Sequence, residues 1–177
     1  MNNIKSKLFI GVFVLALIIP SSASAYFTTA QSATKLNERT ILYTVTYQFG
    51  FAGRELYMPI VSERDLIASS TAFKMGYEIQ DNDKKTSVGK SQSIALSNDE
   101  DIQIKDGQYY LPLTKSAEFT LVTLLTLSDE ELVGDLDLSL LVTNLPFLMV
   151  KEGSPIPSHL NPSELQYYHT PAISLGK

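Results

Sequence analysis

Large apolar residues alternate with polar ones along several stretches of the chain. Between residues 41 and 51, every second residue is large and apolar: Ile41, Tyr43, Val45, Tyr47, Phe49 and Phe51. The same period of two appears at Phe73, Met75, Tyr77 and Ile79, and again at Leu136, Leu138, Leu140 and Val142. Because successive side chains of a strand point to opposite faces, these stretches predict β-strands with one buried face.

The aromatic side chains of residues 41–51 have two interpretations, a platform for a ligand or the inner face of a sheet. They share their face with Ile41 and Val45, and the chain has no tryptophan, which sugar-binding platforms commonly include. Aliphatic neighbours favour burial, where each large side chain contributes roughly 1.5–3 kcal/mol to stability. The sequence therefore predicts a core stripe.

Other stretches refine this picture. Residues 118–127 are apolar on both faces, which predicts a central strand covered on both sides. Asp106-Gly107 predicts a tight hairpin between residues 101–105 and 108–113. Pro59 and Pro112 lie in strand-like runs and predict edge strands or bulges, because proline cannot donate to a ladder.

Helix is scarce in this pattern. Residues 62–73 are compatible with a helical turn between sheets, and residues 161–168 predict a short helix with Asn161 as N-cap and Pro162 in first position. Seven to nine short strands separated by turns predict an all-β fold, an antiparallel β-sandwich. We expect an immunoglobulin-like Greek key, with a jelly roll or small barrel as the alternative.

The first 25 residues have the layout of a secretory signal peptide. Lys5 and Lys7 precede an uncharged apolar run over residues 8–19, and small residues lead to Ala25. The run of about 12 residues is shorter than the roughly 20 that a membrane-spanning helix needs. We expect cleavage between Ala25 and Tyr26, with a retained anchor as the alternative. Residues 26–177 would then form one β-sandwich domain that is exported to the periplasm, the cell surface or the medium.

Composition narrows the class further. There is no cysteine, which excludes disulfides and thiolate chemistry and, for an exported chain, favours a bacterial protein. Residues 26–177 hold 12 basic and 19 acidic residues, with no basic patch. This balance argues against nucleic acid and against anionic lipid as partners. After residue 25, no stretch is apolar enough to span a membrane.

Candidate chemistry is limited. His159 and His169 belong to no metal-ligand or catalytic motif, so we expect no enzyme and no cofactor. Acidic clusters at residues 81–83, 98–101 and 135–137 lie at predicted strand ends, and Asp99, Glu100 and Asp101 are the candidates for a sheet-end calcium site. Their adjacent spacing does not match a calcium loop, so solvated turns are favoured over a metal site.

Tyrosines are the remaining candidate contacts. Tyr109 and Tyr110 must point to opposite faces of a strand, which predicts that one of them, taken here as Tyr110, is exposed. Tyr167 and Tyr168 either form an exposed aromatic patch or pack over a sheet edge.

Together these features favour a non-catalytic module that binds a protein or a cell-envelope component through loops or an edge strand. The alternatives are a structural subunit of a surface assembly joined by strand addition and a hydrolase whose site the sequence hides.

We predict that the exported protein begins at Tyr26, because the Ala23-Ser24-Ala25 site follows a short apolar run. Intact-mass spectrometry of the exported chain measures this directly. An N-terminus at Met1 or Asn2 would show that the segment is retained.

Overall fold

The structure is a computed structural model of the 177-residue chain. It describes residues 24–51, 53–66, 72–97, 99–100, 102–112, 116–151, 153–160 and 162–176, with side chains described from residue 30 onward except at residues 51, 133, 151 and 162. The apolar run of the predicted signal peptide, Asp101 and Asn161 lie outside the described residues.

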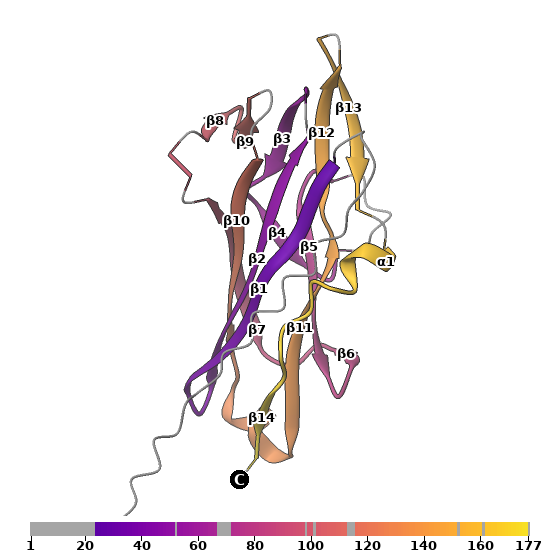
Figure 1. The fold of residues 1–177 in the computed structure, drawn as a ribbon. Coiled ribbons are helices and arrows are strands. Elements are labelled where there is room, and N and C mark those ends of the chain that lie inside the picture. Colours follow the sequence, from indigo (N-terminus) through magenta and orange to yellow (C-terminus); the bar gives the residue numbers. More distant parts are fainter. Residues whose placement is uncertain are drawn as a thin grey trace, which may run out of the picture.

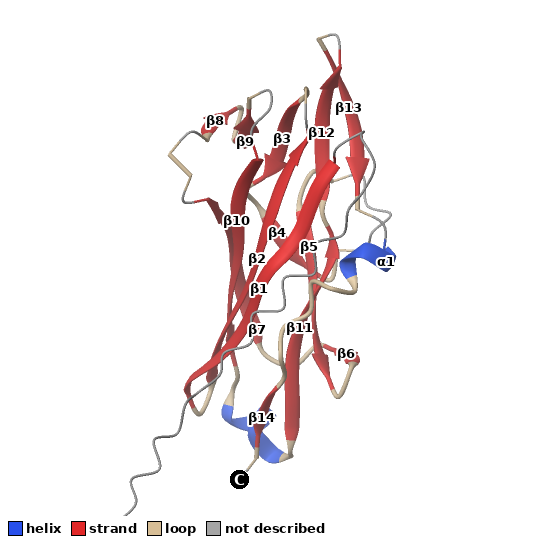
Figure 2. Ribbon diagram, in the orientation of Figure 1, coloured by secondary structure: helices blue, strands red, loops and turns tan. Residues whose placement is uncertain are grey.

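The described chain is all-β and forms three sheets (Figures 1 and 2). The front sheet has four antiparallel strands in the order β1-β2-β10-β7. Their bounds are Ser24–Asn37 (β1), Thr40–Phe51 (β2), Ser116–Thr126 (β10) and Lys90–Ser97 (β7).

Two five-stranded sheets lie behind the front sheet, one above the other in the view of Figure 1. The upper sheet has the order β13-β12-β3-β9-β8, with bounds Ser154–His159, Pro146–Lys151, Glu55–Pro59, Gln108–Leu111 and Gln103–Lys105. The lower sheet has the order β14-β11-β5-β4, and β6 also pairs with β5. Its bounds are Ile173–Leu175 (β14), Leu136–Asn144 (β11), Met75–Asp81 (β5), Ser62–Arg64 (β4) and Lys84–Thr86 (β6).

The lower and upper sheets are joined by short runs of chain, the shortest of them between β11 and β12. β11 ends at Asn144 and β12 begins at Pro146, so only Leu145 separates a strand of one sheet from a strand of the other. The register between β5 and β11 shifts between Val142 and Asn144, where a bulge bends the strand. Leu145 is fully buried. Both rear sheets therefore share one core with the front sheet.

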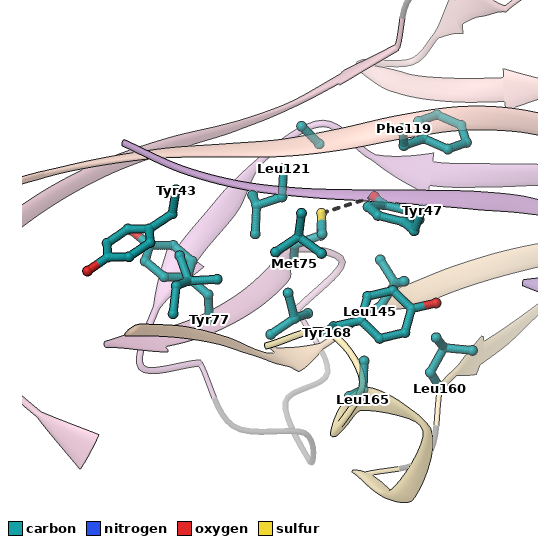
Figure 3. Packing of buried hydrophobic residues seen from close by; sticks show 14 of the residues in the cluster. Tyr43, Tyr47, Met75, Tyr77, Phe119, Leu121, Leu145, Leu160, Leu165 and Tyr168 are labelled. Atoms are coloured by element: carbon teal, nitrogen blue, oxygen red, sulfur yellow. Dashed lines mark hydrogen bonds between the residues drawn. The ribbon is translucent and has the colours of Figure 1, made fainter. Parts of the chain in front are cut away.

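The side chains of β2 form the centre of that core (Figure 3). The Tyr47 ring stacks on Phe119 of β10 at 5.8 Å between centroids, and lies 5.9 Å from the Tyr168 ring. Its hydroxyl donates to the Met75 sulfur of β5 at 3.4 Å. The Tyr43 hydroxyl donates to the Leu138 carbonyl of β11 at 3.0 Å. Burial raises the pKa of both phenols, so they stay neutral and bridge the front and lower sheets.

Several predictions from periodicity are confirmed. The predicted inner faces are buried over residues 41–49, 75–79 and 138–142, whereas Phe73 and Leu136 are half-buried and the side chain of Phe51 is not described. Asp106 and Gly107 have φ of 51° and 73° and join β8 to β9 as a two-residue hairpin turn.

Other predictions are wrong, for identifiable reasons. β10 is an inner strand of its sheet, but its second face is not covered, and Leu124 is 37% exposed there. Pro59 is the last residue of β3, the middle strand of the upper sheet, and Pro112 follows the end of β9. A proline at the end of a strand interrupts few ladder hydrogen bonds, so an inner strand can accept it there as an edge strand can elsewhere. Within residues 62–73, Ser62–Arg64 form strand β4, and residues 67–71 lie outside the described residues, so the predicted helical turn there stays a prediction.

The small-barrel alternative is also wrong. In the described part of the chain, none of the three sheets closes on itself.

Two short helices complete the part of the fold that the structure describes. The predicted helix at 161–168 is a single turn, α1 (Pro162–Leu165), and a 3₁₀ helix, η1 (Asp129–Val133), occupies the polar stretch before β11. None of the helices in the described ranges is long and apolar enough to cross a bilayer.

Hydrogen bonds from Arg64 and to Glu131 hold the loop that leads into β7. The Arg64 guanidinium donates to the carbonyls of Thr86 and Gly89 at 2.7 and 2.6 Å. Glu131 of η1 accepts from the Gly89 N–H at 2.8 Å and from Ser128. The hydrogen bonds from the Ser128 and Gly89 backbone lower the pKa of the Glu131 carboxyl. These contacts fix the start of the front-sheet edge β7.

We predict that Tyr47→Ala and Phe49→Ala each lower the free energy of unfolding by about 3–5 kcal/mol, because each leaves a cavity between sheets. Urea denaturation measures the loss. Tyr47→Phe is the matched control: it keeps the ring, removes only the bond to Met75, and should cost much less. Midpoints equal to wild type would mean that these rings are exposed.

Candidate functional site

The acidic turn lies beside a small cavity. Asp99 and Glu100 are exposed, and the cavity has a volume of about 150 Å³. Its lining residues are Asp99, Glu100, Ile102, Leu111, Pro112, Ser116 and Ala117. Asp99 Oδ2 accepts the Glu118 N–H at 2.7 Å, so this carboxylate already binds the backbone of β10. Among the described side chains, no three His, Asp or Glu residues gather as a metal site would require.

Tyr110 is buried, which contradicts the prediction that one tyrosine of the pair is exposed. Tyr109 points into the core, where its hydroxyl donates to the Ala95 carbonyl at 3.1 Å. Tyr110 lies on the outer side of the upper sheet, where Tyr57 covers it at 5.2 Å and Lys105 Nζ lies 3.2 Å from its ring centroid. A hydrogen bond to Glu55, followed by burial, raises the pKa of the Tyr110 phenol. Alternation tells which face a ring takes but not which side chains cover it.

The C-terminal tyrosines have opposite environments. Tyr167 is 67% exposed, as predicted for a contact residue, whereas Tyr168 is buried against Tyr47 and is a core residue. The backbone of residues 168–170 pairs with β11, since Val142 donates to the Tyr168 carbonyl and Thr170 to the Leu140 carbonyl. This segment therefore extends the lower sheet, and only Tyr167 offers an aromatic surface.

His169 is the histidine that contacts a serine. Its Nε2 lies 2.9 Å from Ser139 Oγ on β11. On the other side of Ser139, its β5 partner Gln80 donates to the Glu78 carboxylate at 2.7 Å. In a catalytic triad, the carboxylate orients the imidazole, whereas Glu78 lies on the serine side. Ser139 is only 1% exposed, so its oxygen has little access to substrate. His159 lies apart from this pair, on the exposed strand β13. This arrangement suits a structural hydrogen bond better than nucleophilic catalysis.

The edges of the sheets differ in how they are protected. β4, β6, β8 and β14 have three residues each. β13 is longer but carries Pro155 and Pro157 at alternate positions, which removes the donors from one side of the strand. The outer side of β7 is engaged by the bridge from Ile94 to Val61.

β1 is the unprotected edge. It spans 14 residues without proline, and no described strand pairs with its second side. Its described side chains are mostly exposed, and Gln31 Nε2 donates to the Tyr167 carbonyl at 2.7 Å. The sequence did not mark this strand, because residues 26–37 lack apolar alternation; the ladder to β2 makes it extended.

The outer face of the front sheet is a second extended surface. Cross-strand pairing places three rows of side chains side by side on it: Thr34, Leu42, Leu124 and Gln92; Ser32, Thr44, Val122 and Ile94; and Ala30, Thr46, Thr120 and Leu96. None of these residues carries a charge. The alternating threonines of β2 were the sequence signal for this face.

Comparisons with protein-family models, with curated proteins and with solved structures gave no match.

We predict that calcium does not change the thermal midpoint of unfolding, because Asp99 is already hydrogen-bonded to the backbone. A bound ion would add RT ln(1 + [L]/Kd), about 2.7 kcal/mol at one hundred times Kd. Melting curves with millimolar calcium and with a chelator, at matched ionic strength, measure this. A rise of several degrees that Asp99→Asn abolishes would instead establish a site.

Proposed function

We propose that this protein is an exported, non-catalytic module that binds a protein or cell-envelope component by adding a partner strand to the free edge of β1. The observation that carries the proposal is the unprotected length of that edge. An exposed strand edge presents unpaired N–H and C=O groups that can pair with another chain. The other long edges of the described sheets carry prolines or a bridge.

For the architecture, we infer a β-sandwich of the immunoglobulin-like type, with the front sheet as one layer and the two rear sheets as the other. The shared core and the continuous run of β11 and β12 support this inference. In this arrangement the outer face of the front sheet and the free edge of β1 are open to solvent, and a partner can bind there.

A structural subunit joined by strand addition is the second candidate. It uses the same edge of β1, with another copy of the chain supplying the strand. A hydrolase has less support, because the serine beside His169 is buried. A purified protein whose mass grows with concentration would favour the subunit over a module with a different partner.

The test uses two neighbouring proline variants, Ala33→Pro and Thr34→Pro. Neighbouring N–H groups of a strand point in opposite directions, so one variant breaks a bond to β2 and the other affects only the free edge. Urea denaturation identifies the free-edge variant as the one with the smaller loss of stability. We expect that variant to lose capture of the component that the wild-type protein retains from a detergent extract of the cell envelope.

The other variant is the matched control for a proline in the same strand. Amide exchange gives a second readout, because the partner should protect alternate amides of residues 30–37 that exchange quickly in the free protein. Capture that survives in the free-edge variant, with unchanged amide exchange, would place binding elsewhere.

A further inference from the structure

Exposed aliphatic side chains gather on the outer face of the front sheet. Val61, Ile94, Leu96 and Leu124 are 55%, 45%, 41% and 37% exposed. Val61 joins this face because it bridges to Ile94 of β7. A contiguous apolar patch of this kind on a folded domain commonly marks an interaction surface.

Four hydroxyl groups of the same face bond to each other in two pairs. Ser32 Oγ lies 2.7 Å from Thr44 Oγ1, and Thr46 Oγ1 lies 3.0 Å from Thr120 Oγ1. When a surface is buried, hydroxyls that bond to each other keep a hydrogen bond, whereas hydroxyls that bond only to water lose theirs and pay a larger desolvation penalty. The three uncharged rows can therefore be covered at a low desolvation cost.

Charges appear on this face at its two ends. Lys90 lies four residues before Ile94 on β7. Glu118 lies four residues before Val122 on β10, and Val122 is the cross-strand partner of Ile94. Because β7 and β10 are antiparallel, the cation and the anion lie on opposite sides of the central row. Both side chains are exposed.

We propose that a second copy of this chain packs face to face on the outer face of the front sheet, with its strands antiparallel and a two-fold axis at the row of Ile94 and Val122. This axis places Lys90 of each copy diagonally opposite Glu118 of the other. The two backbones are offset by one strand, about 5 Å, and by the sheet spacing of about 10 Å, which a lysine and a glutamate side chain can span together. An isologous contact of this type uses the same patch on both subunits.

Charge and area both favour a second copy as the occupant. The chain has a net charge of −5, so two copies repel through most surfaces, but the three central rows carry no charge. Four strands are about 19 Å wide, and the three rows with the end positions of Lys90 and Glu118 extend about 34 Å along β10, so the face covers up to roughly 650 Å², against about 800 Å² per partner in a standard interface. Aligned packing of two twisted sheets at about −30° suits this face.

The test is a charge reversal followed by its rescue. Lys90→Glu puts two carboxylates together twice in each dimer, so we expect the dimer to weaken on the order of tenfold at low ionic strength. Adding Glu118→Lys restores opposite charges and should return the dissociation constant to within about threefold of wild type. Sedimentation velocity over a concentration series measures both.

Controls separate this contact from assembly through β1. Lys84→Glu makes the same change of charge on β6, away from the face, and should leave the dimer unchanged. The free-edge variant should also leave it unchanged; the register of the front sheet assigns this role to Ala33→Pro, outside the three rows, because the Ala95 N–H points away from β10 to Ile60 and the bond directions alternate across the paired strands. Val122 lies on the two-fold axis, so Val122→Lys would place the two introduced lysines opposite each other. Their like charges should abolish the dimer.

Three results would overturn the proposal. One is a wild-type protein that stays monomeric at every concentration. Another is association that Lys90→Glu does not weaken or that the double variant does not restore. The third is association that is lost only in the free-edge proline variant, which would assign it to strand addition. Because Lys90 and Glu118 are exposed, their variants test the contact even if Val122→Lys does not fold.

Discussion

The buried face of β2 is the contact on which the other elements depend. Tyr43 bonds to the backbone of β11, Tyr47 bonds to Met75 of β5, and Phe49 packs edge-on against Phe147 of β12 at 4.9 Å. One strand thus touches both rear sheets. The chain has no cysteine to brace the layers, so this apolar contact must do what disulfides do in many small exported domains.

Local pattern could predict much of the core but little of the surface. The alternation of residues 41–49 and the Asp106-Gly107 turn depend on nearby residues alone, and the structure has them as predicted. The environment of Tyr110 depends on Tyr57, which is distant in sequence, and that of Tyr168 on pairing with β11. Period two assigns a side chain to a face, but strand order decides whether that face is covered.

The candidate surfaces were harder to predict for the same reason. β1 has no apolar alternation and is extended because β2 pairs with it. Its position at an edge, and the position of β7 at the other edge, follow from non-local strand order. The outer face of the front sheet combines residues from β1, β2, β7 and β10, which lie far apart in the chain. Only the threonine alternation of β2 pointed to it.

The pairing of β2 with β10 also has a consequence for how the chain folds. Thr46 and Thr120, which touch across these strands, are 74 residues apart in sequence. Contacts of such long range make folding slow, since a large loop must close before the pairing stabilises it. A chain that has not yet made this pairing lacks the β10 residues that cover β2, such as Phe119, on which Tyr47 stacks. Exposed apolar side chains and an unpaired strand edge are the features that make incompletely folded chains prone to aggregation.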